Sequence, residues 1–314
     1  MDFPIREFMD EQRCHDKLFE ILHPEGLHCP CCQRADALVV HDHSRKPVLR
    51  YRCGHCNRIF HLFTGTPLAG VRRRTCAELL LLLRGIAKGT PTKELAREVG
   101  CSEGQLLSLR HRLQDLAKRS LDEARQPLPD QHVEADEMYQ NSGAKGEVHD
   151  DPEDPARCRG NKRRGQGTFA NDRPPVAGVV GRETGEVRLE VVEHADKATL
   201  EEFVVNNTEP GATVYTDGSA CYNGLPERDR PHASVNHSER EYARDDDGDG
   251  FCEVHDNTME GIWTGLRNFL RPFRGLNKHF LAGYVAIFEW AHNFKVATDD
   301  ALRLLLGRPL VPVT

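Results

Sequence analysis

The sequence contains no apolar run long enough to cross a membrane. The longest candidate, Leu79–Leu83, is far shorter than the roughly 20 residues that a transmembrane helix needs. The opening residues, MDFPIREFMDEQRCHDK, are acidic and polar and lack the basic and apolar segments of a secretory signal. These absences exclude an integral membrane protein, and we expect a cytoplasmic protein without a membrane partner.

The net charge of −7 is unevenly distributed along the 314 residues. Residues 1–128 contain 21 Lys and Arg against 16 Asp and Glu, a balance of +5. Residues 129–314 contain 21 against 33, a balance of −12. A basic front half is typical of a module that holds DNA, and an acidic back half of one that binds metal through carboxylates. Ordinary surface variation would give similar values, so charge alone decides little.

Eleven cysteines without a secretory signal favour free thiols or metal sites over disulfides. Two C-x2-C pairs, separated by 20 residues, contain Cys29, Cys32, Cys53 and Cys56. Four thiolates on two tight turns can converge tetrahedrally on one structural Zn²⁺. Short strands between and after the pairs then predict a zinc ribbon over residues 26–66. Cys31 is expected to stay free because the two-residue gap favours its neighbours, and the alternative interpretation is a set of buried thiols.

A helical region is predicted for residues 67–126, after an N-terminal helical segment over residues 1–25. Thr90 is expected to cap a helix with Pro91 at its first position, and Gly100 to end that helix. A helix, a short turn with glycine and a second helix have the spacing of a helix-turn-helix.

The second helix of this motif is expected to begin with a capping box formed by Ser102 and Gln105. Its predicted inward-facing side chains are Leu106, Leu109 and Leu113. The side chains left for solvent or for DNA are Gln105, Ser108, Arg110 and Arg112. The alternative is a small helical hairpin with a solvated polar face.

Residues 127–298 alternate strands with helices. The predicted order is a strand with Asp136 (HVEADEMY), a hairpin (VAGVVGRETGEVRLEVVE), a helix (DKATLEEFVVNN), a strand ending at Asp217 and a late helix (NTMEGIWTGLRNFLRPF). This is the order of an α/β ribonuclease-H-like fold, in which two strand acids lie side by side and the late helix adds a third. Residues 140–172 have almost no apolar side chains and predict a mobile loop, and residues 299–314 a C-terminal tail.

Several blocks of the sequence resemble ISXO-type insertion-sequence transposases, a DDE group. These blocks are VEADEMY, VYTDGSACYNGL, VNHSEREYAR and HDNTMEGIWTGLRNFLR, together with the zinc ribbon, FHLFTGTP and the helix-turn-helix. The likeness extends over roughly residues 10 to 295 and rests on the order of many blocks. It implies a DNA transposase that cleaves DNA ends with the help of metal ions and transfers the strands.

The resemblance places the catalytic acids on Asp136, Asp217 and Glu260, which would bind two Mg²⁺ (or Mn²⁺) ions. Arg267 matches the basic residue that follows the third acid. It lies two helical turns after Glu260 and so on the same side, where it could hold a DNA phosphate. Supporting roles are implied for His237, His255 and Asn257.

Each acid also has a plain structural interpretation. Glu134 shares the strand face of Asp136 and is its main rival as a ligand. Asp217 lies in a Thr-Asp-Gly turn, where aspartate often makes only local hydrogen bonds. Glu260 could simply complement the dipole in the first turn of its helix.

The acidic run 245–253 looks like an insertion relative to the family and is expected to be a solvated loop. It partly fits a calcium loop, with Asp245, Asp247, Asp249 and Gly250 at positions 1, 3, 5 and 6 and Asp256 at position 12. Position 12 normally holds glutamate, and no second loop of this kind occurs.

The implied partners are double-stranded DNA, both terminal inverted repeats and target DNA, and further copies of the chain. Two DNA ends must be joined, which implies a homodimer or a higher assembly, associated with the nucleoid. Two other functions stay open at this point. One is a non-catalytic DNA-binding regulator from a decayed element, and the other is a ribonuclease-H-like nuclease without strand transfer.

Overall fold

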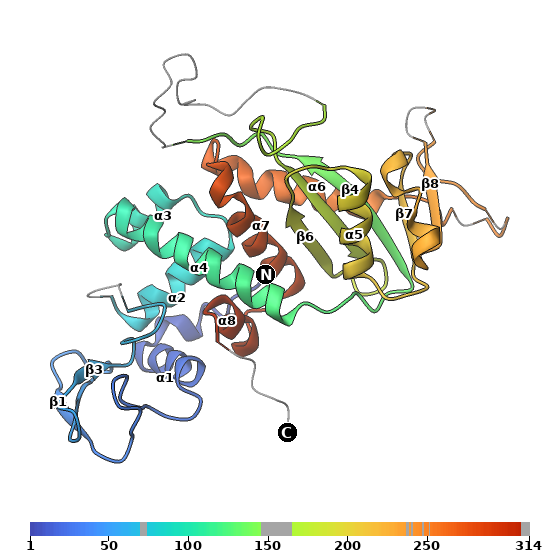
Figure 1. The fold of residues 1–314 in the computed structure, drawn as a ribbon. Coiled ribbons are helices and arrows are strands. Elements are labelled where there is room, and N and C mark those ends of the chain that lie inside the picture. Colours follow the sequence, from blue (N-terminus) through green and yellow to red (C-terminus); the bar gives the residue numbers. More distant parts are fainter. Residues whose placement is uncertain are drawn as a thin grey trace. The chain divides into compact units, whose positions relative to one another are not determined.

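The computed structural model describes residues 1–69, 74–145, 165–236, 239, 241–246, 248–250 and 252–308, apart from the side chain of Glu7. The chain forms two compact units, coloured along the sequence in Figure 1. Unit 1 contains Met1–Glu123 and Phe294–Thr314, and unit 2 contains Ala124–Asn293. No helix among the described residues is long and apolar enough to span a bilayer.

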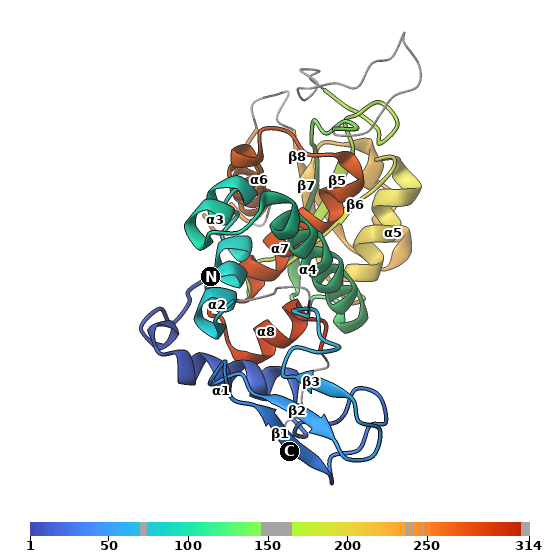
Figure 2. The ribbon, with the colours of Figure 1, turned by 90° about the vertical axis from the view of Figure 1, so that its left-hand side faces the viewer.

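Unit 1 combines a small sheet with helices. Its antiparallel sheet, in the order β1-β2-β3, consists of β1 (Leu38–Asp42), β2 (Arg50–Cys53) and β3 (Ile59–His61), and it is seen near α1 in Figure 2. Its helices are η1 (Glu7–Met9), α1 (Glu11–Leu22), α2 (Cys76–Ala87), α3 (Thr92–Val99), α4 (Glu103–Ala124) and α8 (Asp299–Leu305). The three strands of the predicted ribbon are therefore present.

The helix-turn-helix corresponds to α3 and α4, with small differences at the caps. α3 begins one residue later than predicted, with Pro91 rather than Thr90 as its N-cap and without a side-chain cap hydrogen bond. Gly100 ends the helix in the left-handed conformation at φ 65°, as expected of a glycine there. At the start of α4, the Gln105 backbone N–H donates to Ser102 Oγ at 3.3 Å.

The prediction that Arg110 faces solvent is wrong. Arg110 is fully buried, and its Nη2 donates to the Thr90 carbonyl at 2.5 Å. Leu106 and Leu113 are buried as predicted, and positions four and three residues away on a helix lie on the same side, so Arg110 belongs to the inner face. Gln105, Ser108 and Arg112 are exposed.

The predicted C-terminal tail is, over its described residues, a buried helix of unit 1. Leu302 and Leu305 of α8 are fully buried. Lys17 of α1 donates to Asp299 at 2.6 Å, and Arg303 donates to the Glu20 carbonyl at 3.0 Å. These contacts attach the last helix to the first one.

Unit 2 contains a five-stranded sheet in the order β6-β5-β4-β7-β8. Its strands are β4 (His132–Tyr139), β5 (Pro175–Gly181), β6 (Val187–Val191), β7 (Thr213–Asp217) and β8 (His232–Val235). β4, β5 and β6 pair antiparallel, whereas β7 and β8 run parallel to β4. An antiparallel three-strand meander extended by two parallel strands is the ribonuclease-H-like arrangement that the element order predicted.

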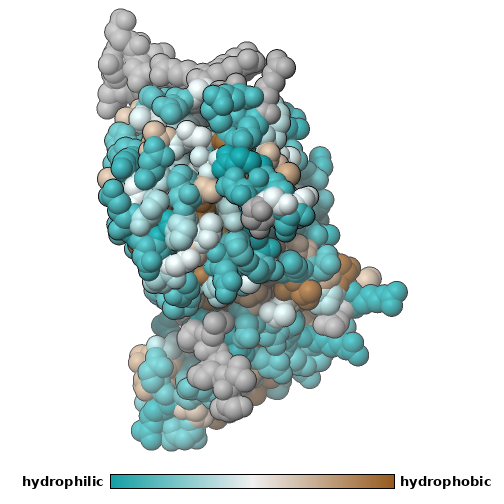
Figure 3. All heavy atoms as spheres, turned by 90° about the vertical axis from the view of Figure 1, so that its right-hand side faces the viewer, coloured by the Kyte–Doolittle hydropathy of each residue, from teal (hydrophilic) through white to brown (hydrophobic). Residues whose placement is uncertain are grey.

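Helices cover both faces of this sheet (Figure 1). The helical segments are α5 (Lys197–Asn207), η2 (Ala220–Tyr222), η3 (Leu225–Arg228), α6 (Asn257–Leu270), η5 (Arg271–Phe273) and α7 (Lys278–Asn293). Val133 and Ala135 point toward the core that contains α5, whereas Met138 points toward the core that contains α6 and α7. Figure 3 shows that the face of unit 2 carrying β7 and β8 is mainly hydrophilic.

Most of the predicted mobile loop over residues 140–172 lies outside the described residues. Its described start is held in place, because Ser142 is buried and its Oγ donates to the Leu276 carbonyl at 2.8 Å. Asn277 pairs with Gly143 in an isolated parallel bridge.

Candidate active site

Asp136 and Asp217 lie side by side on adjacent parallel strands. Their strands pair with Glu134 opposite Tyr215, and continuing this register by two residues sets Asp136 opposite Asp217. Paired residues on neighbouring strands point to the same face of a sheet. The fold thus brings together two acids that are separated by 80 residues in the sequence.

The carboxyl group of Asp136 is held in an environment that disfavours its negative charge. Burial raises its pKa to about 8, and the nearby charges of Glu137 and Asp217 add to this effect. The Trp263 indole opposes the shift by donating a hydrogen bond from Nε1 to Asp136 Oδ2 at 2.7 Å. A divalent cation between these acids would remove the repulsion, so the donor set fits a hard metal ion such as Mg²⁺.

Glu260 lies in the first turn of α6 and is exposed. Trp263, three residues further along the same helix, provides the hydrogen bond to Asp136, so Glu260 and the indole share one side of α6. Among the described residues, only four cysteines form a group of ligand atoms all within 4.8 Å of one another. The oxygens of the three acids therefore do not converge to that distance.

Three acids whose oxygens do not all lie within 4.8 Å of one another can still bind two metal ions. Two catalytic ions lie about 3.5–4 Å apart, and Mg²⁺–oxygen distances are about 2.1 Å. Acids that flank the pair from opposite sides can thus have oxygens roughly 8 Å apart.

Glu134, the alternative to Asp136 as a metal ligand, is hydrogen-bonded to residues of α6. It is completely buried, and its Oε2 accepts a hydrogen bond from the Met259 backbone N–H at 2.9 Å. Its Oε1 accepts from Thr258 Oγ1 at 2.8 Å. Glu134 therefore binds the N-terminus of α6, the helix that carries Glu260, and fixes it to β4.

Arg182 completes this anchor. Its Nε donates to Glu134 Oε1 at 2.8 Å, and its two Nη atoms donate to the carbonyls of Glu253 and His255, each at 2.6 Å. The guanidinium group lies 4.0 Å from the centre of the Tyr215 ring. One buried ion pair thus connects the hairpin after β5, the strand β4 and the segment leading into α6.

The residues given supporting roles are distributed differently around the site. His255 Nδ1 is 3.2 Å from Glu134 Oε1, so its nearest acid belongs to the anchor. Asn257 is the exposed first residue of α6, and Arg267 is exposed in its last turn. His237 lies outside the described residues.

Glu137 is a neighbour of the acid pair to which the sequence analysis gave no role. Its carboxylate accepts hydrogen bonds from Tyr222 at 2.9 Å and from Tyr139 at 3.4 Å. Burial raises the pKa of Glu137, and the negative charge of Asp217 acts in the same direction. Strand alternation places its side chain on the face of β4 opposite to that of Asp136.

The described residues of the acidic run close into a loop. Arg244 and Val254 pair in an antiparallel bridge at its base. Both carboxylate oxygens of Asp245 accept loop backbone N–H groups, from Gly248 at 2.6 Å and Gly250 at 2.9 Å. Asp247 lies outside the described residues.

The four paired cysteines of unit 1 form two matching turns. Cys29, Cys32, Cys53 and Cys56 bring their sulfur atoms within 4.8 Å of one another. In each turn the first cysteine's carbonyl accepts the N–H of a left-handed residue four positions later, Gln33 or Asn57, at 2.9 Å. Cys31 is exposed and outside the group, as predicted.

The sulfur environment fits a cation. Burial disfavours the thiolate of Cys29, but hydrogen bonds from the backbone N–H groups of Cys32 and Cys31 outweigh it and lower the pKa to about 6. Backbone N–H donors also lower the pKa of Cys53, whereas burial and the neighbouring sulfur atoms raise the pKa of Cys32 and of Cys56. Four sulfur ligands in this arrangement could hold one zinc ion.

The chain is similar to several known proteins. Residues 128–293 match the family described as ISXO2-like transposase domain. A protein of the transposable element ISH50 from Halobacterium salinarum is 31% identical over 309 residues, 98% of this chain and 99% of that one. A transposase-like protein of Haemophilus influenzae is 28% identical over 105 residues, 33% of this chain and 77% of that one. The catalytic core of HTLV-2 integrase in complex with magnesium is 11% identical and covers 53% of this chain and 87% of its own, with a TM-score of 0.29.

The family match includes the whole of the acid-bearing sheet and α6. Asp136, Asp217 and Glu260 all fall within the matched residues 128–293. The ISH50 relative extends the likeness over unit 1 as well. The chain therefore belongs to the ISXO2-like transposase family.

Proposed function

We propose that the protein is a DDE transposase that binds the terminal repeats of an insertion sequence and catalyses metal-dependent DNA end cleavage and strand transfer. The observation that carries this proposal is the position of Asp136 beside Asp217, with α6, the helix that carries Glu260, held against β4 by Trp263. Two neighbouring carboxylates repel each other when both are ionised, and a cation bound between them removes this repulsion.

Asp136, Asp217 and Glu260 would hold two Mg²⁺ or Mn²⁺ ions. When bound, such ions activate an attacking oxygen and stabilise the leaving oxygen of an in-line displacement at phosphorus. Asp136 must lose its proton to act as a ligand, and the Trp263 hydrogen bond favours the ionised form. Arg267, on the exposed side of α6, would hold a DNA phosphate beside the site.

Two displacements account for the reaction. In the first, water attacks the phosphorus at the end of the element, and the bond to the 3′ oxygen breaks to leave a free 3′-OH. In the second, this hydroxyl attacks a phosphodiester of the target DNA, and the target strand's own 3′ oxygen leaves. Neither step requires a covalent bond to the enzyme.

The zinc ribbon and the helix-turn-helix would bind the terminal repeats. On α4 the exposed Gln105, Ser108 and Arg112 remain candidates for DNA contact. Arg110 is withdrawn from that set because its side chain is buried. Joining two ends requires a homodimer or a higher assembly on DNA.

The test compares the wild type with Glu260→Gln on a labelled duplex that carries the terminal repeat, with Mg²⁺. Glu183→Gln, which changes an exposed acid of the same unit, is the matched control. We expect nicking at the repeat end and strand transfer by the wild type and the control. The Glu260→Gln variant should bind the duplex and leave it uncut.

Other outcomes distinguish the alternative functions. Binding without cutting by the wild type would replace the proposal with a DNA-binding regulator. Cutting without any joined product would leave a nuclease.

A further inference from the structure

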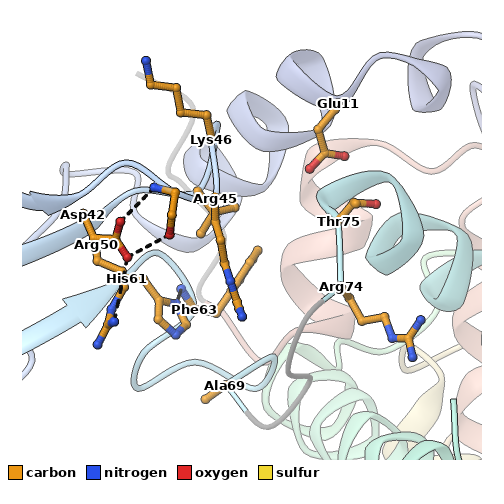
Figure 4. A pocket seen from close by; sticks show the side chains of 12 residues that line it. Glu11, Asp42, Arg45, Lys46, Arg50, His61, Phe63, Ala69, Arg74 and Thr75 are labelled. Carbon is orange, nitrogen blue, oxygen red and sulfur yellow. Dashed lines mark hydrogen bonds and ion pairs between the residues drawn. The ribbon is translucent and has the colours of Figure 1, made fainter.

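A cleft of about 820 Å³ opens in unit 1 between the zinc ribbon and the helices (Figure 4). The hairpin between β1 and β2, residues 42–50, forms one wall. Glu11 of α1 and Thr75 at the start of α2 contribute to the other. None of the three acids of unit 2 and none of the four cysteines lines this cleft.

The two acids that line the cleft already serve backbone groups. Asp42 accepts hydrogen bonds from the Ser44 N–H at 2.8 Å and from the Ser44 hydroxyl at 2.9 Å. Glu11 accepts from the N–H groups of Cys76 at 2.7 Å and Ala77 at 3.0 Å, at the N-terminus of α2. These donors and the helix dipole offset much of both negative charges.

The positively charged side chains of the hairpin have far fewer hydrogen bonds and ion pairs than these acids. Arg45 and Lys46 are exposed and make no hydrogen bond or ion pair with another described residue. Arg50 reaches Asp42 only at 4.0 Å. Arg74 differs, since its guanidinium donates to the carbonyls of Val99 and Gly100 at the end of α3.

The electrostatic potential beside the hairpin is positive, because its cations have few partners whereas the two acids are already hydrogen-bonded. Burial lowers the pKa of His61, which also lines the cleft, and the positive charges of Arg50 and Arg45 lower it further. In Figure 4, Arg45 reaches into the opening between the hairpin and Arg74, whereas Lys46 points away from it along the rim. The positive groups are thus spread along the hairpin and do not surround one point.

Spread cations suit a chain of negative charges better than a single compact anion. Each strand of duplex DNA carries one phosphate for every ~3.4 Å of helix axis, and arginine and lysine are its usual backbone contacts. We propose that the phosphodiester backbone of DNA binds along this hairpin, at the mouth of the cleft, through Arg45, Lys46 and Arg50. The inference rests on the proposed function and names the contact by which the ribbon would hold the element's end.

The experiment measures the affinity of the full-length, zinc-containing protein for terminal-repeat and random duplexes. The salt concentration is varied between about 50 and 200 mM, where affinity that depends on phosphate contacts falls steeply. The test variant is Arg45→Ala with Lys46→Ala. The control is Arg34→Ala together with Lys118→Ala, which removes the same charge from residues paired with Asp36 and Asp122. Zinc content and circular dichroism confirm that each protein is folded.

We expect the test variant to lose about 8-fold in affinity for each lost contact near 0.1 M salt, since each phosphate contact contributes about 0.9 to the logarithmic salt slope. The slope itself should become shallower by about 1.8, equally for both duplexes. The control variant should retain the slope of the wild type. A test variant that binds with the slope and affinity of the wild type would overturn the proposal.

The nicking assay separates this inference from the proposed function. If the wild type nicks the repeat and the test variant binds and nicks equally well, the transposase proposal stands and the hairpin does not hold DNA. If the wild type neither binds nor cuts DNA, both are wrong. Lower affinity with a shallower slope supports binding along the hairpin even when Glu260→Gln has the same nicking activity as the wild type.

Discussion

Trp263 Nε1 donates a hydrogen bond to Asp136 Oδ2 at 2.7 Å, across 127 residues of sequence. This contact joins the helix that carries Glu260 to the strand that carries the first acid. It also favours the ionised form of a carboxyl group whose pKa burial raises to about 8. Trp263 is therefore a positioning residue that also adjusts the charge of its partner.

Replacing Trp263 with Phe removes the donor and keeps most of the apolar volume. The pKa of Asp136 should rise further, because the lost hydrogen bond lowered it. We expect the Mg²⁺ concentration for half-maximal nicking to increase about tenfold at pH 7, the equivalent of ~1.4 kcal/mol for a bond to a charged group. The difference should shrink above pH 8.5. Trp290→Phe controls for the loss of a buried indole, and equal Mg²⁺ requirements for all three proteins would disprove the idea.

The metal-free protein should become less stable as the pH rises from about 4 to about 8. Folded Asp136 keeps its proton up to about pH 8, whereas the unfolded chain releases it near pH 4. The folded state therefore binds more protons in this window, and the free energy of unfolding falls with increasing pH. Thermal unfolding of the wild type and of Asp136→Asn, both in EDTA, measures this. The variant should show the weaker pH dependence, and parallel curves would rule the assignment out.

The sequence predicted those features of the site that depend on neighbouring residues, and it missed those that depend on contacts between distant parts of the chain. The strand with Asp136, the strand ending at Asp217 and the helix with Glu260 follow local patterns and were confirmed as elements. The apolar segment that forms α8 was read as a tail, although its leucines offered a signal. The burial of Arg110 was missed because the spacing of the leucines shows which side of α4 faces inward but not how many residues beside them are also buried.

The functions of Glu134 and Trp263 had no local cue. Glu134 finds its partners in Thr258 and Met259, more than 120 residues away. On the strand it simply alternates with Asp136, so sequence alone left both as candidate ligands. Only the pairing of β4 with α6 separates the acid that anchors the helix from the acid that faces Asp217.

Replacing Glu134 with Gln should destabilise unit 2 strongly. The change leaves the Arg182 guanidinium, whose side chain is 15% exposed, without its carboxylate, and breaking a buried ion pair costs up to about 3–5 kcal/mol. Urea unfolding measures the loss. Glu183→Gln affects only an exposed pair with His132 and should unfold close to the wild type. Similar stabilities for the two variants would show that the anchor contributes little.

The thiol group of Cys31 should be dispensable for zinc, whereas that of Cys32 should be essential. Cys32 belongs to the four-sulfur group and Cys31 does not. Purified Cys31→Ser is therefore expected to contain one zinc ion per chain, and Cys32→Ser to lose it and with it much of the ribbon's structure. Metal analysis and circular dichroism test this. Loss of zinc from both variants, or from neither, would contradict the assignment.

Replacement by alanine should have opposite effects on stability at two glycines, Gly178 facing α6 and Gly261 within it. Gly178 pairs with Asp136 across β5 and β4, and a Cβ there would collide with Met259 and lie 2.6 Å from the Trp263 ring. Gly178→Ala should thus displace α6 and cost about 1–3 kcal/mol, the usual effect of overpacking. Gly261 is exposed within α6, and its Cβ would meet nothing within 4 Å.

Gly261→Ala should therefore stabilise the protein by roughly 0.5–1 kcal/mol, because alanine favours the helix. The pair separates a general effect of alanine from displacement of the helix. Nicking should fall in Gly178→Ala, since Glu260 moves with α6, and stay unchanged in Gly261→Ala. Equal nicking by both variants, at protein concentrations corrected for the folded fraction, would show that the site tolerates movement of α6.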